Sequence, residues 1–89
     1  MRATIGDRAV HLVRVDASRR MRRFYRVALA PDLIDGWRLT REWGRIGQPG
    51  TLRQACFADL ARAQEAAEAV MAAKVKRGYR VQAVAQVRR

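Results

Sequence analysis

Cysteine, histidine and long apolar runs are nearly missing from this chain of 89 residues. Cys56 and His11 are single, which excludes an internal disulfide and a zinc site built from four Cys and His ligands. No run of about 18 apolar residues is present, and the first residues lack the apolar stretch of a secretory signal. We therefore expect a reduced domain of the cytoplasm, with no membrane span, no metal ion and no cofactor.

Motifs of catalysis are also absent. The chain contains no Walker loop, no Gly-x-Gly-x-x-Gly fingerprint and no His-Glu-x-x-His metal motif. No nucleophile motif accompanies His11, so we assign it a structural role, and Cys56 lies in an apolar stretch typical of a small buried residue. Asp32 and Asp35 stand in a loop with Pro and Gly, where they suit turn formation. We expect no enzymatic activity and no small-molecule substrate.

Acidic residues are scarce, and the chain is correspondingly basic. Eight Asp and Glu stand against nineteen Lys and Arg, which gives a net charge of +11. The densest cluster contains four arginines, Arg19, Arg20, Arg22 and Arg23. Such a field attracts polyanions, above all nucleic acid, and guanidinium groups suit phosphate. A coding bias that enriches arginine and alanine together is the alternative explanation.

The remaining pattern is typical of several strands followed by one helix. Alternating and β-branched residues predict strands over 9–16, 24–30, 37–43 and 51–57. The basic cluster and two stretches rich in Gly and Pro form the turns, and such short connections favour antiparallel neighbours. Residues 80–89 are either a frayed basic end or a short additional strand. We expect an α+β fold, with an antiparallel sheet of four or five strands and one helix on one face.

The helix is predicted from about Asp59 to Arg77, where strong helix formers dominate. Asp59 can cap its start, and Gly78 stands at the position that ends many helices. One stripe of the helix carries Leu60, Ala63, Ala67, Met71 and Lys74. Because most of this stripe is small, we expect the helix to lie close to a sheet whose own residues are large.

The two faces of the sheet follow from the alternation of side chains. The face expected under the helix carries Val13, Val15, Tyr25, Val27, Leu29, Trp37, Leu39, Leu52 and Cys56. The opposite face is expected to carry one arginine from each strand, Arg14, Arg26, Arg38 and Arg53. That face is either a solvated surface or a cationic platform.

The triplet Trp43-Gly44-Arg45 stands just before the turn at 47–50. It joins an aromatic plane to a fixed positive charge, the two groups that hold a base or sugar and its phosphate. The triplet resembles the signature of the WGR domain, a family named for these residues. Further positions match the family in order over about 22–79, namely Phe24-Tyr25, Phe57, Ala63, Lys74 and Gly78-Tyr79.

The resemblance implies a single WGR-like domain over 1–89, with a core at about 9–79 and flexible basic ends at 1–8 and 80–89. WGR domains help DNA-damage-dependent poly(ADP-ribose) polymerases to bind DNA at breaks, and they also occur in bacterial proteins of unknown function. By this resemblance Trp43 stacks near a terminal nucleotide, and Arg45 contacts DNA or a neighbouring domain. No segment here resembles the catalytic or zinc-finger domains of those polymerases, so ADP-ribosyl transfer is not implied.

Two functions remain open at this point. The first is a nucleic-acid-binding module, for DNA ends or breaks in preference to RNA, that uses Trp43, Arg45, Tyr79 and the cluster Arg19, Arg20, Arg22 and Arg23. The second is an adaptor whose same surface docks an acidic protein, with only nonspecific affinity for nucleic acid. The triplet also has a structural interpretation, in which Trp43 is a core residue, Gly44 a bulge and Arg45 a solvated charge.

Overall fold

The computed structural model describes residues 8–32, 34 and 36–86. It contains β1 (Arg8–Asp16), a short 3₁₀ turn η1 (Ala17–Arg19), β2 (Met21–Pro31), β3 (Trp37–Arg45), β4 (Thr51–Phe57), α1 (Leu60–Lys76) and β5 (Arg80–Gln86). The α+β class expected from the sequence is therefore confirmed, and of the predicted four or five strands the sheet has five. Of the predicted flexible ends at 1–8 and 80–89, residues 1–7 and 87–89 lie outside the described residues, whereas Arg8 belongs to β1 and residues 80–86 form β5.

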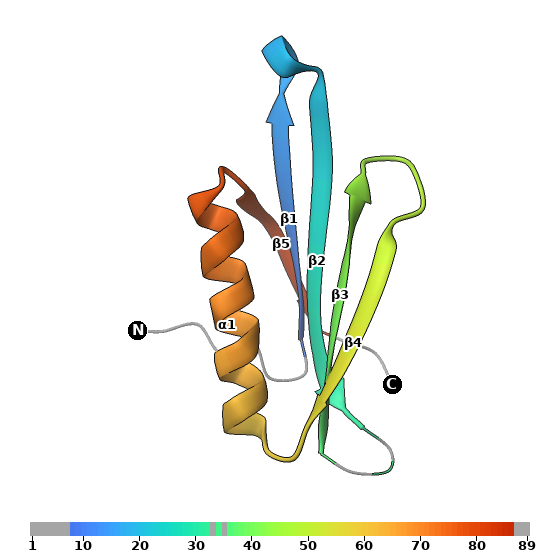
Figure 1. Cartoon of the computed structure of the whole chain (residues 1–89), viewed down its shortest axis with the longest axis vertical. Coiled ribbons are helices and arrows are strands. Elements are labelled where there is room, and N and C mark those ends of the chain that lie inside the picture. The colour runs from blue at the N-terminus through green and yellow to red at the C-terminus, as the bar shows by residue number, and fades with distance from the viewer. Residues whose placement is uncertain (1–7, 33, 35, 87–89) are drawn as a thin grey trace.

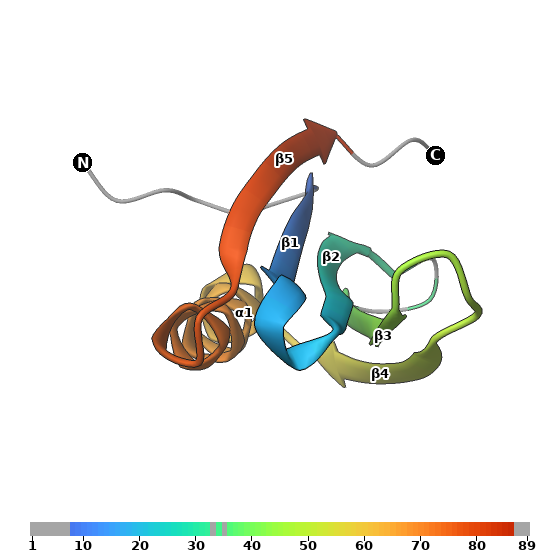
Figure 2. The ribbon, with the colours of Figure 1, turned by 90° about the horizontal axis from the view of Figure 1, so that it is seen from above.

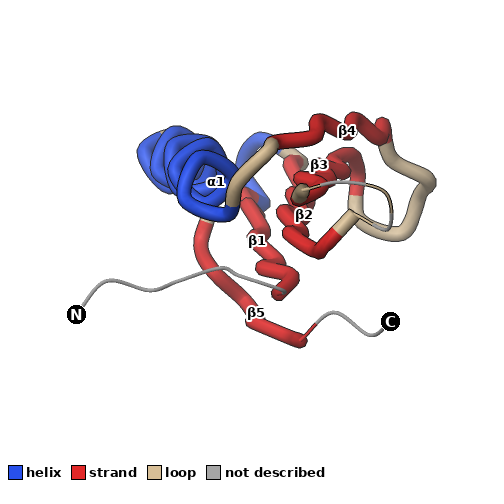
Figure 3. The backbone as a smooth tube through the Cα atoms, turned by 90° about the horizontal axis from the view of Figure 1, so that it is seen from below, coloured by secondary structure: helices blue, strands red, loops and turns tan. Residues whose placement is uncertain are grey.

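The strands form one antiparallel sheet in the order β4-β3-β2-β1-β5. The first four strands are joined by short turns, and the chain then returns through α1 to place β5 beside β1. The sheet is curved, and α1 lies along one side of it (Figures 1, 2 and 3). Residues 80–86 are thus a fifth strand, which decides between the two alternatives for this segment.

The core lies between α1 and the middle of the sheet. It consists of Val10, Leu12, Tyr25, Val27, Leu29 and Leu39 from the sheet, with Ala63 and Ala67 from α1. Both alanines are fully buried, so their small side chains let the helix backbone approach the large residues of the strands. The predicted stripe of small helix residues is confirmed.

Both ends of α1 have satisfied backbone groups. Asp59 accepts a hydrogen bond from the N–H of Arg62 at 2.8 Å and caps the first turn. At the other end the N–H of Tyr79 donates to the carbonyl of Lys74, and the N–H of Gly78 donates to that of Val75, each at 3.0 Å. Gly78 has a φ of +101°, which completes a Schellman motif and turns the chain directly into β5.

The strand pairing corrects the predicted faces of β1. Leu12 lies opposite Tyr25, and Val10 lies opposite Val27, so these two residues face the helix instead of Val13 and Val15. Apolar residues stand on both faces of β1, and alternation alone therefore could not choose between them. As a consequence Arg14, two residues after Leu12, lies on the helix side.

The prediction for β4 was wrong in the same way. Leu52 pairs with Glu42 on the side away from α1, whereas Arg53 pairs with Arg41 on the helix side. Cys56 is exposed rather than buried and lies opposite Arg38. The expected row of one arginine from each strand therefore does not exist, since two of its four members lie on the other face.

Candidate nucleic-acid interface

Three connections meet at one end of the sheet: the β1–β2 turn, the β3–β4 turn and the passage from α1 to β5 (Figure 1). The β1–β2 hairpin extends beyond the C-terminal end of α1 (Figure 1). All the site residues predicted from the sequence lie at this end, namely Arg19, Arg20, Arg22, Arg23, Trp43, Arg45 and Tyr79. They are distributed over two pockets that adjoin each other.

A tight turn at η1 holds the basic cluster. Asp16 accepts hydrogen bonds from the N–H of Ser18 at 3.1 Å and from its hydroxyl at 2.7 Å, and the hydroxyl bond is the main reason why the pKa of Asp16 is lowered. Arg20 closes the turn in the left-handed conformation, with φ of 53°. The turn is shorter than predicted, so Arg22 and Arg23 belong to β2 and their side chains alternate between the faces.

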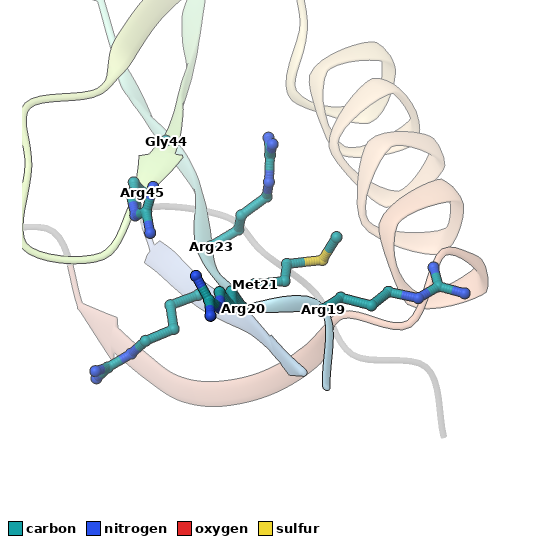
Figure 4. Close-up of a pocket in the computed structure, with 7 residues that line it drawn as sticks. Arg19, Arg20, Met21, Arg23, Gly44 and Arg45 are labelled. Atoms are coloured by element: carbon teal, nitrogen blue, oxygen red, sulfur yellow. The ribbon is translucent and has the colours of Figure 1, made fainter. Parts of the chain in front are cut away.

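The first pocket, here called the arginine pocket, has a volume of about 210 Å³. Its lining consists of Arg19, Arg20, Met21, Arg22, Arg23, Gly44 and Arg45. Figure 4 shows guanidinium groups extending around it in different directions. The lining contains five arginines and no carboxylate, so the pocket is suited to an anion.

A row of arginines crosses three strands at this end of the sheet. Arg14 of β1 lies directly opposite Arg23 of β2, and Arg23 lies directly opposite Arg45 of β3. Residues opposite each other in antiparallel strands project from the same face, here the face that carries α1. Like charges in such positions destabilise a sheet unless an anion lies between them. We call these three residues the arginine row.

The second pocket, here called the aromatic pocket, has a volume of about 320 Å³. It is lined by Arg14, Met21, Arg23, Tyr25, Trp43, Lys74, Arg77 and Tyr79. The Trp43 ring stacks on Tyr25, with centroids 5.6 Å apart and planes 11° apart, and Tyr79 meets Tyr25 edge-on at 78°. Trp43 is half-buried: it packs against the core and also forms part of the pocket wall.

Lys74 places a cation among these rings. Its Nζ atom lies 4.6 Å from the centroid of Tyr25 and 6.0 Å from that of Tyr79. Burial lowers the pKa of Lys74, and the positive charges of Arg77 and Arg41 lower it further. A phosphate beside Lys74 would act in the opposite direction, because it favours the charged ammonium.

Gly44 has a packing role and is not a bulge. It pairs in regular register with Phe24, and a Cβ atom on it would lie 3.0 Å from the Cα of Gly50 and 3.4 Å from the Phe24 ring. The following turn uses Gly47 at a φ of +89°. The glycine of the triplet therefore lets the β3–β4 turn pack closely against the strand that carries Trp43 and Arg45.

Sequence reasoning missed five residues of the aromatic pocket: Arg14, Met21, Tyr25, Lys74 and Arg77. The alternation along β1 assigns Arg14 to the wrong face of the sheet. Lys74 lies in the last turn of α1 and Arg77 is its C-cap residue, and a spacing of three places two side chains on one side of a helix. This spacing, just before Tyr79, is the signal that could have identified them.

The remaining candidate residues lie elsewhere. His11 is half-buried and stacks on Phe24 with centroids 6.3 Å apart, in agreement with a structural role. Asp32 accepts a hydrogen bond from the N–H of Ile34 at 2.9 Å, which is the expected turn chemistry; Asp35 lies outside the described residues.

Within the described part of the chain, no group of three or more His, Cys, Asp or Glu could hold a metal ion. None of the helices described there is both long and apolar enough to cross a membrane.

The curved five-stranded sheet, its single helix and the triplet at the end of β3 define a WGR domain. Residues 8–86 match that family, and the chain belongs to it. A curated relative, the uncharacterized protein y4dW of Sinorhizobium fredii, is 35% identical over 71 residues, which are 80% of this chain and 35% of that protein. The chain thus spans about a third of the length of this relative. No solved structure matches the chain.

Proposed function

We propose that this WGR domain is a non-catalytic module that binds nucleic acid at strand ends or breaks, DNA in preference to RNA. The arginine row carries the proposal. Three cations lie opposite one another on adjacent strands, and the linings of both adjoining pockets contain no carboxylate. Phosphate groups between these side chains would turn their mutual repulsion into attraction.

The aromatic residues support a role in end recognition. Trp43 and Tyr79 stand beside the arginine row, so a nucleotide whose phosphate contacts Arg23 could place its sugar or base against them. The proposed preference for DNA and for breaks is supported by the family, because WGR domains are known in poly(ADP-ribose) polymerases for binding DNA breaks. Arg45 remains a proposed phosphate contact.

Fluorescence anisotropy at physiological salt tests this function. The ligands are a 5′-phosphorylated duplex end, a hairpin-closed duplex, a single strand and RNA. We expect the open DNA end to bind most tightly, and Arg23→Gln and Arg45→Gln each to weaken binding. Each variant should reduce the slope of log K against log salt by about 0.9 for every phosphate that the protein no longer neutralises.

The matched control is Arg62→Gln, which removes the same charge at the other end of α1, where Arg62 lies 3.8 Å from Asp59. This variant should bind like the wild type apart from a small general weakening. If Arg23→Gln and Arg62→Gln have equal effects, or if all ligands bind equally weakly, net charge alone accounts for binding and the proposal is wrong.

The alternative is an adaptor that docks an acidic protein on the same surface. The arginine row favours this alternative as well, since guanidinium groups also form paired hydrogen bonds with carboxylates. An adaptor would bind DNA weakly and without regard to ends, and a partner rich in Asp and Glu would bind competitively with DNA. The Arg23→Gln variant should then fail to bind the protein partner.

A further inference from the structure

We infer that the aromatic pocket accepts one unpaired nucleotide at a DNA strand end, while the phosphates next to it lie on the arginine row and in the arginine pocket. This inference rests on the proposed function and narrows its ligand. The preferred end is then an overhang or a frayed terminus rather than a blunt, fully paired end.

The walls of the aromatic pocket restrict what can enter. The sheet contributes Tyr25 and Trp43, the last turn of α1 contributes Lys74, and Arg77 and Tyr79 come from the end of the helix and the residues that follow it. A volume of about 320 Å³ is at the lower limit of pockets for small ligands, which begin at about 300 Å³. This volume suits one nucleotide, whereas a base pair would have to bring a second base and a second backbone past the end of α1.

The lining also provides the two kinds of contact that an unpaired nucleotide makes. Trp43 and Tyr79 contribute aromatic rings to this lining, and such rings stack on any base whose face is free. The Trp43 ring is itself held by its stack on Tyr25 and by Arg41, whose guanidinium carbon lies 5.7 Å from the ring centroid. Arg14, Lys74 and Arg77 add positive charge within the same pocket. The Nζ atom of Lys74 lies over the Tyr25 ring, so positive charge and aromatic surface are adjacent in this pocket.

The two pockets share lining residues, so together they offer a path for a DNA strand. Met21 and Arg23 line both pockets, and Arg23 is the middle member of the arginine row. Adjacent strands lie about 4.8 Å apart, so the row offers a series of cations across the sheet rather than a single point. A DNA strand that leaves the aromatic pocket therefore meets positive charge immediately and continues into the arginine pocket.

The test uses one hairpin stem of DNA whose open end is blunt, carries one unpaired nucleotide, or carries one abasic residue. In anisotropy competition we expect the unpaired nucleotide to improve affinity about tenfold over the blunt end, because one base gains a stacking partner. The abasic residue should bind like the blunt end. Tyr79→Ala and Lys74→Met should remove the advantage of the unpaired nucleotide and change blunt-end affinity much less.

A spectroscopic measurement keeps the test independent of affinity. The chain has two tryptophans, so in a Trp37→Phe protein Trp43 is the only one left. Its emission should change with the unpaired nucleotide and stay unchanged with the blunt or abasic end. Circular dichroism of each variant verifies that it is folded.

The possible results separate the inference from the function on which it rests. If blunt and unpaired ends bind the wild type equally, and Trp43 emission responds to both alike, the inference is overturned. The proposed function survives that result as long as Arg23→Gln still weakens binding. If Arg23→Gln has no effect on any ligand, both are wrong.

Discussion

Gly50 and Trp43 are in contact through their backbones. A Cβ atom on Gly50 would lie 2.5 Å from the carbonyl oxygen of Trp43 and 2.8 Å from the ring of Phe24. Together with Gly44, which lies against the Cα of Gly50, this contact fixes the β3–β4 turn on the strand that carries the family triplet. The two glycines therefore help to position Trp43 and Arg45.

Replacing Gly50 by alanine should destabilise the fold. The added methyl group has no space beside the Trp43 carbonyl, so the turn must shift, and we expect the free energy of unfolding to fall by about 1–3 kcal/mol. Urea denaturation measures the change. Gln48→Ala, in the exposed part of the same turn, is the control and should stay within about 0.5 kcal/mol of the wild type. Equal stability of Gly50→Ala and the wild type would contradict the contact.

Replacing Arg20 by glycine should raise stability and weaken binding at the same time. Arg20 adopts a left-handed φ of 53°, which is unfavourable for a residue with a Cβ atom. Glycine relieves this strain but makes the unfolded chain more flexible, so the expected net gain is up to about 1 kcal/mol. Thermal unfolding and DNA titration of the same samples verify both effects. A variant that is more stable yet binds like the wild type would exclude Arg20 from the interface.

Replacing Lys74 by methionine should also separate stability from binding. Burial and the charges of Arg77 and Arg41 disfavour the ammonium in the free protein, as its lowered pKa indicates. The neutral variant should therefore have a higher melting temperature, whereas the slope of log K against log salt should fall by about 0.9 if Lys74 contacts a phosphate. A lower melting temperature would mean that the contact of Lys74 with Tyr25 outweighs the repulsion.

Because of Asp32, the stability of the fold should depend on pH in the acidic range. The hydrogen bond from the Ile34 N–H, together with Arg38 at 3.0 Å, lowers the pKa of Asp32 below its usual 3.8. A carboxyl with a lower pKa in the folded state stabilises the protein above pH 3.8, and this contribution is lost as the pH falls through the lowered value. The difference in urea midpoint between wild type and Asp32→Asn should thus be largest near neutral pH and vanish in strong acid. A constant difference at every pH would contradict this account.

The sequence was sufficient wherever local signals were unambiguous. Strand 51–57 was predicted with its observed limits, and Asp59 and Gly78 marked the ends of α1, because caps and left-handed glycines act within a few residues. The triplet identified the family, and the predicted site residues do gather at one end of the sheet.

The sequence was insufficient wherever the pairing between distant strands decided the outcome. β1 carries apolar residues on both faces, so only its register with β2 shows that Leu12 faces the core and Arg14 the pocket. The arginine row consists of residues 14, 23 and 45, which are neighbours only after three strands have paired. Such a row has no signature in the linear chain.

The Schellman motif at the end of α1 has a kinetic consequence. The N–H of Tyr79 donates to the carbonyl of Lys74, so one backbone hydrogen bond joins two residues that line the aromatic pocket. Unwinding the last turn of the helix breaks this bond and thereby removes a constraint that holds Lys74 and Tyr79 together at the pocket. If a nucleotide binds in the aromatic pocket as proposed, its rate of dissociation should depend on how often this last helical turn frays.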